Sequence, residues 1–272
     1  NAPDLQVAYD GSAFVPGGFS GINFNVKVGD PAFDWAWGDH VEPGVSISNC
    51  CDKNNSGLVM FSCIGNEATL IEAKMDGKDV KLKGSTGVVT GKDGAGSRVV
   101  VYFPKRVIEK LCVGDMIQIK ACGAGMKLTD YPDVTLANMS PKLLKALNPS
   151  EKAGKVRVPV VKIIPGKIMG SGVGAGHPQA ADYDIQSVSP EAVKEYTLDA
   201  LRLGDVVAIM DYDATTGARW QPGALSVGVI CHGASRLSGH GPGVNIILTS
   251  PRGAVEPIIT RKANIAELMG LQ

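Results

Sequence analysis

The sequence predicts a mainly β protein, built as layered sandwich or barrel subdomains with a few short helices. Short runs rich in β-branched and apolar residues recur along the chain with glycine between them. These runs are residues 58–64, 99–103, 116–120, 156–164, 206–210, 226–230 and 244–248. The segments with helical character are few and do not alternate regularly with the strands, which disfavours a doubly wound parallel sheet.

The strand runs at 116–120 and 206–210 follow the same turn. Leu111–Ile119 and Leu201–Ile209 both fit the pattern L-x-φ-G-D-φ-φ-x-I, where φ is apolar, so a Gly-Asp turn delivers an apolar strand in each case. Two copies predict an internal repeat, with equivalent places in related β substructures. Chance is the alternative, because Gly-Asp turns before strands are common.

Four segments are predicted to be helical: residues 104–111, 140–147, 189–201 and 261–269. The third has the clearest start, with Ser189 as the N-cap, Pro190 at the first helical position and Glu191 in the first turn. The polar, Pro/Gly-containing stretch 148–154 separates a helix from a strand run. We therefore predict an N-terminal β domain over residues 1–150 and a C-terminal β domain over 151–272.

Charge and composition exclude several classes of protein. Lys plus Arg and Asp plus Glu both number 27, and the basic residues are dispersed, so no nucleic-acid partner is expected. We find no signal peptide and no apolar run of the roughly 20 residues that span a bilayer, so no membrane association is expected. The six cysteines form no Cys-x-x-Cys pair. These features predict a soluble protein in the reducing cytoplasm, without structural zinc or disulfides.

Residues 170–243 hold three of the four histidines and most of the tight glycine clusters. The run Gly170–Gly176 matches neither dinucleotide nor P-loop spacing, and His177-Pro178 follows where a helix would have to begin, so no nucleotide is expected. One interpretation is a flexible loop. The other is a nest of backbone N–H groups facing a substrate or an oxyanion, with Gly172, Gly174 and Gly176 as substrate-binding residues.

Two Asp-x-Asp pairs, Asp182/Asp184 and Asp211/Asp213, project both carboxylates to one face if their segments are extended. Such pairs, together with histidine, suit zinc, manganese or iron. The predicted metal ligands are His177, Asp182, Asp211 and His232, and the predicted acid–base groups are Asp184, Asp213 and His240. The structural alternatives are that the aspartates cap turns and that the histidines only hydrogen-bond.

Several other residues are weaker candidates. Folding could bring in His40, but its aromatic neighbours in Trp35–His40 equally indicate a packed loop. Arg219 and Arg236 flank the motifs and are predicted to bind a carboxylate or phosphate of the substrate, with solvated surface as the alternative. The loop Gly239–Gly243 is expected to be ordered beside the same pocket or at a subunit interface.

The motifs together resemble a known prokaryotic family. The combination of Gly172–Asp184, Gly204-Asp205, Met210–Asp213 and Cys231–Gly243 looks like the family catalogued as domain of unknown function 4438. That resemblance spans the whole chain and implies a mainly β fold, without an activity. A second, local resemblance is to acetamidase/formamidase enzymes, but this sequence lacks their Gly-Asp-Gly-Glu motif.

The function expected from these features is metal-assisted hydrolysis of a small amide or cyclic amide. A divalent ion would lower the pKa of a bound water, His240 or a free carboxylate would move protons, and the glycine loop would stabilise the oxyanion. We expect a small-molecule substrate and a homo-oligomer. The rival is a non-enzymatic ligand-binding or assembly protein, in which the glycines make turns at a subunit interface.

Overall fold

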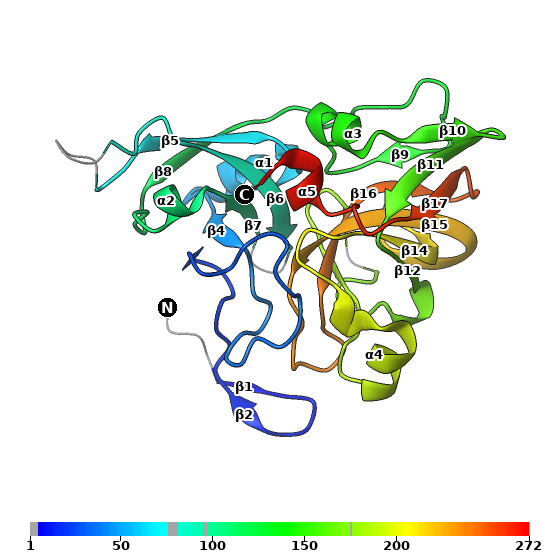
Figure 1. Cartoon of the computed structure of the whole chain (residues 1–272), viewed down its shortest axis with the longest axis horizontal. Coiled ribbons are helices and arrows are strands. Elements are labelled where there is room, and N and C mark those ends of the chain that lie inside the picture. The colour runs from blue at the N-terminus through cyan, green and yellow to red at the C-terminus, as the bar shows by residue number, and fades with distance from the viewer. Residues whose placement is uncertain (1–4, 76–80, 95–96, 175, 272) are drawn as a thin grey trace.

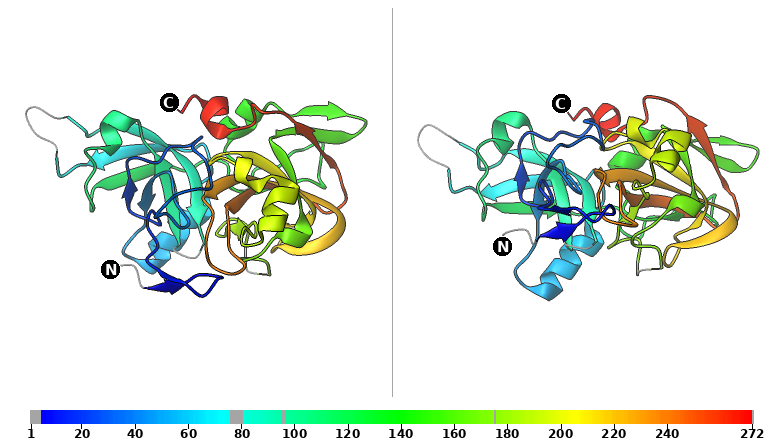
Figure 2. Two further views of the ribbon diagram at one scale, coloured as in Figure 1. Left: turned by 60° about the horizontal axis from the view of Figure 1, so that its bottom comes forward. Right: turned by 90° about the horizontal axis from the view of Figure 1, so that it is seen from below.

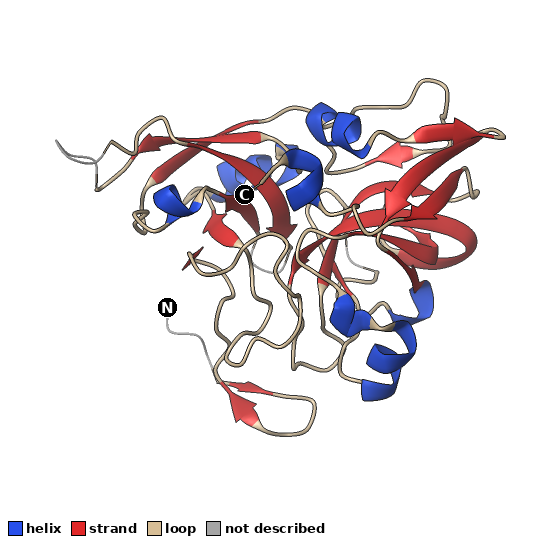
Figure 3. Cartoon of the chain, in the orientation of Figure 1, coloured by secondary structure: helices blue, strands red, loops and turns tan. Residues whose placement is uncertain are grey.

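The structure is a computed structural model that describes residues 5–75, 81–94, 97–174 and 176–271. Strands dominate these residues, and helices are short and scattered (Figure 3). The strands form four separate sheets, two of them six-stranded. The predicted mainly β fold with a few short helices is therefore confirmed.

The N-terminal half is built around one six-stranded antiparallel sheet in the order β3-β4-β7-β6-β5-β8. Its strands are β3 (Ile22–Asn23), β4 (Gly44–Ile47), β5 (Glu67–Glu72), β6 (Thr86–Asp93), β7 (Arg98–Tyr102) and β8 (Met116–Lys120). Two helices pack beside it, α1 (Asp52–Phe61) and α2 (Lys105–Ile108). A two-stranded hairpin, β1 (Gln6–Val7) and β2 (Ala13–Phe14), projects from this half (Figure 1).

The C-terminal half contains the second large sheet, ordered β12-β14-β15-β16-β13. Its strands are β12 (Lys162–Pro165), β13 (Tyr183–Asp184), β14 (Val206–Asp213), β15 (Arg219–His232) and β16 (Gly243–Ser250). The short β9 (Thr135–Leu136) joins it by pairing with β16. A three-stranded sheet of β10 (Ser150–Lys152), β11 (Lys155–Val160) and β17 (Val255–Ile259) lies beside it.

The predicted helical segments all contain a helix, but a shorter one. Besides α2 they are α3 (Pro141–Leu147), α4 (Pro190–Tyr196) and α5 (Ile265–Met269), with 3₁₀ turns η1 (Gly166–Ile168) and η2 (Leu198–Ala200). Ser189 caps α4 as predicted, accepting a hydrogen bond from the Ala192 N–H at 3.2 Å. Thr197, with φ of 47°, ends that helix before η2. No described helix has the length and apolarity needed to cross a membrane.

The strand predicted at 58–64 is wrong, because residues 52–61 form α1. Leu58 and Val59 face the N-terminal core, whereas the Phe61 side chain is 59% exposed, which is the one-sided burial of a helix. A short apolar run does not by itself distinguish a strand from a helix end. The polar residues 52–57 that complete the helix gave no periodic signal.

The two Gly-Asp turns are locally alike. Asp115 accepts a hydrogen bond from the Cys112 N–H, and Asp205 accepts one from the Arg202 N–H, both at 2.8 Å. The strands that follow are not equivalent, since β8 is an edge strand and β14 lies between β12 and β15. The neighbours therefore do not support an internal repeat; the shared pattern encodes a turn.

Side chains of β6 and β16 join the two halves, which lie side by side (Figure 2). The Asn245 carboxamide accepts a hydrogen bond from the Lys92 N–H at 2.7 Å and donates to the Lys92 carbonyl at 3.0 Å. It also donates to the Ala181 carbonyl at 3.2 Å. Gly91 permits this approach, because a Cβ there would lie 2.6 Å from the Cys231 Cβ.

The Lys92 side chain is fully buried at this junction. Its ammonium donates to Asn138 Oδ1 at 2.7 Å and to the Gln179 carbonyl at 2.6 Å. These bonds, with one from Asn138 Nδ2 to the Pro178 carbonyl, fix residues 178–182 against the N-terminal half. Burial lowers the pKa of Lys92 to about 8.

We predict that stability rises with pH because of Lys92. Between pH of about 8 and about 10.5 the unfolded chain holds a proton that the folded chain has lost, so deprotonation favours folding. Relative to Lys92→Met, the wild type should gain up to about 3 kcal/mol of unfolding free energy across this window. Urea unfolding of both proteins at each end of the window measures it. An unchanged difference between them would show that the ammonium is not desolvated.

Candidate metal centre between the two halves

Gly170 and Ser171, at the start of the glycine run, pair with Asp184 of β13. The Gly170 N–H donates to the Asp184 carbonyl at 2.7 Å, and the Asp184 N–H donates to the Ser171 carbonyl at 2.9 Å. A Cβ on Gly172 would lie 2.5 Å from the Asp182 carbonyl oxygen. Close backbone packing thus explains glycine here. Gly172 and Gly176 also line a cavity, whereas Gly174 is not among its lining residues.

The loop Gly239–Gly243 lies beside the same cavity, as predicted, and His240 lines it. Its glycines make room for neighbours: a Cβ on Gly241 would collide with the Ile185 carbonyl oxygen. A Cβ on Gly243 would collide with the imidazole of His232. The glycines are therefore needed to place His240 and His232 next to the Asp182–Asp184 strand.

His232, at the end of β15, contacts both carboxylates of the first pair. Its Nε2 lies 2.8 Å from Asp182 Oδ2 and 3.4 Å from Asp184 Oδ1. Its Nδ1 donates to the Gly233 carbonyl at 2.9 Å. Asp182 also accepts a hydrogen bond from the Gly94 N–H at 2.7 Å. The prediction that Asp182 and Asp184 face the same side is confirmed.

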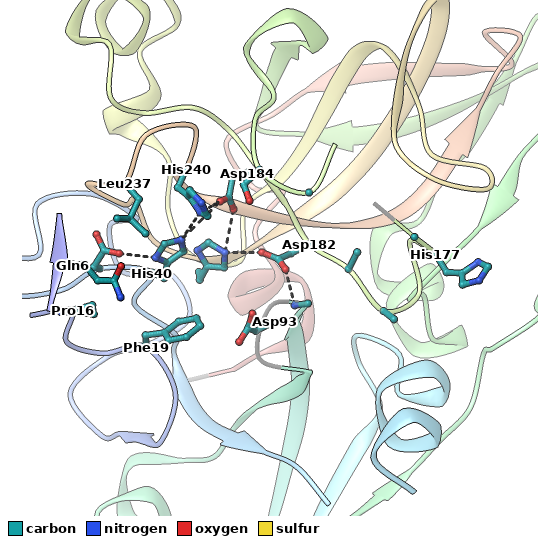
Figure 4. A pocket seen from close by; sticks show the side chains of 18 residues that line it. Gln6, Pro16, Phe19, His40, Asp93, His177, Asp182, Asp184, Leu237 and His240 are labelled. Carbon is teal, nitrogen blue, oxygen red and sulfur yellow. Dashed lines mark hydrogen bonds and ion pairs between the residues drawn. The ribbon is translucent and has the colours of Figure 1, made fainter. Parts of the chain in front are cut away.

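Two more histidines meet at Asp184 (Figure 4). His240 Nδ1 lies 2.9 Å from Asp184 Oδ2, and His40 Nε2 lies 3.8 Å from the same oxygen. The two imidazoles face each other, with His40 Nε2 and His240 Nδ1 3.1 Å apart. Asp39 holds the other side of His40, since its Oδ2 is 2.6 Å from Nδ1. Three histidines and two aspartates thus converge from both halves of the chain.

The histidines and carboxylates of the cluster strongly shift one another's pKa values. Burial alone would favour neutral imidazole, but hydrogen bonds to Asp182 and Asp184 outweigh it and raise the pKa of His232 well above its usual value. The pKa of His40 is raised for the same reason by Asp184 and Asp39. Burial opposes ionisation of Asp184, yet the three histidines hold its pKa far below the usual range. The buried carboxylates therefore stabilise positive charge placed next to them.

The hydrogen bonds of the Nδ1 atoms show which nitrogen of each imidazole carries hydrogen. A carboxylate or carbonyl only accepts, so His40 and His232 both carry hydrogen on Nδ1. In neutral imidazole each Nε2 is then an acceptor: that of His232 faces oxygens of Asp182 and Asp184, and that of His40 faces His240 Nδ1 and, farther away, Asp184 Oδ2. Asp184 Oδ1 is buried, and its contact with His232 Nε2 at 3.4 Å is too poorly aligned to count as a full hydrogen bond. A proton on each imidazole or a cation between these groups relieves the repulsion.

The spacing of these atoms suits a metal ion. Bonds of about 2.0–2.2 Å place neighbouring ligand atoms about 2.8–3.6 Å apart in octahedral or tetrahedral geometry. The donor atoms of His40, His232 and Asp184 all lie within 4.8 Å of one another. Asp182, Cys231 and His232 form a second such group, but burial raises the pKa of the Cys231 thiol well above its usual value. The first group is therefore the better candidate.

A cavity of about 550 Å³ opens onto this cluster. Its walls come from the N-terminal segment, from the end of β6, from the loop before β13 and from the loop after β15. Lining residues outside the cluster include Gln6, Pro16, Phe19, Asp93, Ser171, Ala180, Ala181 and Leu237. The site therefore combines a metal-ligating cluster with room for a small molecule.

His177 does not belong to the cluster, contrary to its predicted role as a ligand. It lines the outer part of the cavity, together with Asp182 and Asp184, but its side chain is exposed and points away from the other histidines (Figure 4). Pro178 and Gln179, held by Asn138 and Lys92, separate it from Asp182. The shared pocket was predicted correctly and the ligand role was not.

The second Asp-x-Asp pair lies outside the cavity, so the structure does not support its predicted metal and acid–base roles. Asp211, with φ of 55°, sits at a bulge in β14, and its carboxylate accepts the Gly223 N–H at 2.8 Å. Asp213 is buried, accepts the Thr215 N–H at 3.1 Å and pairs with Arg219 at 2.9 Å. Both have the turn-capping role that was the structural alternative.

The predicted arginines do not reach into the cavity. Arg219 forms an ion pair with Asp213. The guanidinium of Arg236 stacks 4.9 Å from the centroid of Phe14 and donates to Ser12 at 2.7 Å. Only the backbone N–H of Arg236 serves the site, by donating to Asp39 Oδ1 at 2.7 Å. Neither guanidinium is placed to bind a substrate anion.

His40 was only a weak candidate from the sequence, yet it is the histidine that completes the cluster. Its aromatic neighbours suggested a packed loop, yet Trp37 is 88% exposed and His40 lies in the cluster. The useful signal was the adjacent Asp39, because a histidine that binds metal usually donates its second nitrogen to a carboxylate or carbonyl. No spacing rule links His40 to His240, which lies 200 residues away.

Comparison with known proteins confirms the first of the two family resemblances. The N-terminal domain of a family described as domain of unknown function (DUF4438) matches residues 5–145, and its C-terminal domain matches residues 146–269. The crystal structure of TM1086 is 42% identical in sequence, with a TM-score of 0.90 over 98% of this chain and 92% of that chain. No curated protein matches significantly. These matches give no support to the acetamidase/formamidase resemblance.

Proposed function

The chain belongs to the family described as domain of unknown function (DUF4438), and from the geometry of its site we propose a metal-dependent hydrolase of a small amide or cyclic amide. The observation that carries this proposal is the convergence of His40 Nε2, His232 Nε2 and the Asp184 carboxylate, whose donor atoms all lie within 4.8 Å of one another. A divalent cation between them would bind both imidazoles and the carboxylate. The rival, a non-enzymatic ligand-binding protein, would use the same cavity without turnover.

The proposed ligands are His40, His232, His240 and Asp184. The three imidazoles are neutral, and the two carboxylates of Asp184 and Asp182 balance the charge of one divalent ion. This donor set suits zinc, manganese or iron rather than calcium or magnesium, which prefer oxygen ligands. Asp39 and the Gly233 carbonyl are the outer partners that fix the two imidazoles with Nε2 inward.

Asp182 is the proposed general base. It lies at the edge of the cluster, is partly exposed to the cavity and is oriented by the Gly94 N–H. The ion would lower the pKa of a water in the cavity. Asp182 would accept a proton from that water as its oxygen bonds to the amide carbon, and would pass the proton to the nitrogen as the C–N bond breaks. Gln6 and Ser171, both uncharged, line the cavity and can hydrogen-bond an amide.

Metal analysis tests the proposal most directly. Protein purified without added metal, and protein dialysed against zinc or manganese, should hold close to one ion per chain by plasma mass spectrometry. A panel of small amides and cyclic amides then tests turnover, which should disappear on chelation and return with metal. One bound ion without turnover would favour the binding protein, and the absence of any ion would refute both the metal centre and the hydrolase.

Asp39 should influence metal affinity without being a ligand. In Asp39→Asn the carboxamide can donate to His40 Nδ1, so the imidazole would carry its hydrogen on Nε2 and turn an N–H toward the ion. We expect a loss of zinc affinity of about 10–100-fold, typical of such outer partners. Competition with a zinc-chelating dye measures it. Asp30→Asn, at a carboxylate that caps the Lys27 N–H, is the control and should bind zinc normally.

A further inference from the structure

The charge on the cavity wall limits the substrates that can enter. Asp39, Asp93, Asp182 and Asp184 line the cavity, and no lysine or arginine is among its described lining residues. With one divalent ion bound, Asp184 and Asp182 are balanced, and Asp39 is held by His40 and by backbone and hydroxyl donors. The wall then offers an incoming anion no positive side chain.

One arginine next to the wall, Arg98, is paired with a carboxylate. Arg98 donates to Asp93 Oδ2 at 2.8 Å, and its guanidinium lies 4.7 Å from the centroid of the Phe19 ring. Phe19 lines the cavity, whereas Arg98 is not among its lining residues. Arg98 supports the ring and balances Asp93, rather than facing a ligand.

Much of the remaining wall is apolar, and this apolar part begins beside the cluster. The Phe19 ring packs edge-on against His40, with centroids 5.6 Å apart. Pro16 and Leu237 also line the cavity, as do Ala180 and Ala181 of the loop before β13. An apolar group of a ligand held at the metal centre would therefore contact Phe19 directly.

We infer that the site takes an uncharged amide with an apolar substituent about the size of an aromatic ring, and discriminates against amides that carry a carboxylate or phosphate. This inference rests on the proposed metal-dependent function. A ring against Phe19 removes apolar surface from water on both sides. A substrate anion would find no lysine or arginine on the described wall to replace its lost hydration, and burying an unpaired charge is costly.

Hydroxamic acids test this preference, because their common head group chelates the metal while the tail varies. Zinc-loaded protein should bind benzohydroxamic acid at least about tenfold more tightly than acetohydroxamic acid, and at least about tenfold more tightly than 4-carboxybenzohydroxamic acid. Isothermal titration calorimetry gives the three constants. Equal or tighter binding of the carboxylated probe would overturn the inference.

Two variants test whether the preference for the aromatic probe arises from contact with Phe19. In Phe19→Ala the advantage of benzohydroxamic over acetohydroxamic acid should fall at least about fivefold, with zinc content unchanged. Phe24→Ala, at a ring that is 57% exposed and is not among the lining residues, should retain it. If the wild type takes up no zinc, the proposed function fails and this inference with it. Zinc uptake with no preference among the three probes would overturn the inference alone.

Discussion

Replacing Asp184 with asparagine is expected to abolish metal binding and to destabilise the metal-free protein. The carboxylate contacts His40, His232 and His240 and is almost fully buried. Removing its charge leaves no proposed carboxylate ligand at the centre of the cluster. Zinc affinity should fall more than about 100-fold, beyond the loss typical of an outer partner.

The same change should lower the unfolding free energy of the chelated protein by about 3 kcal/mol, because breaking a buried ion pair leaves charge uncompensated. Urea unfolding after chelation measures this, and dye competition measures zinc. Asp213→Asn is the matched control: it also removes a buried, ion-paired carboxylate, but outside the cavity. It should cost stability and leave zinc affinity unchanged. Equal zinc affinities for Asp184→Asn and the wild type would refute the assigned ligand set.

Gly243→Ala is expected to have the second largest effect, through His232. A Cβ at position 243 would collide with the imidazole, while the backbone angles there do not require glycine. The methyl group should displace His232 from its place between Asp182 and Asp184. We expect zinc affinity to fall at least about 100-fold and overpacking to cost about 1–3 kcal/mol of stability.

Gly57→Ala is the control for this change. Gly57 lies in α1 with open space around its Cα, so alanine should leave zinc affinity unchanged and raise stability by about 0.5–1 kcal/mol. Chemical unfolding and dye competition on both variants separate the two effects. Normal zinc affinity in Gly243→Ala would mean that the His232 imidazole is not a ligand.

The sequence correctly predicted features that depend on only a few adjacent residues. The Ser189 cap, the Gly-Asp turns and most strand runs follow from a few adjacent residues, and the structure has them. Asp182 and Asp184 were predicted to share a face because alternate residues of an extended segment do so. The same rule suggested a site at Asp211 and Asp213, but a bulge and a turn use those carboxylates as caps.

The sequence by itself determined a mainly β chain whose chemistry lies in the Asp182–Asp184, His232 and His240 motifs, because periodicity and turn residues act over a few positions. Only the tertiary structure decided which histidine completes the cluster. His177 is close in sequence, but Lys92 and Asn138 hold the residues beside it and its imidazole points outward. His40 is distant in sequence, yet the packing of the two halves brings it to His240 and Asp184. Pairing across 200 residues depends on how two sheets pack, which no local pattern encodes.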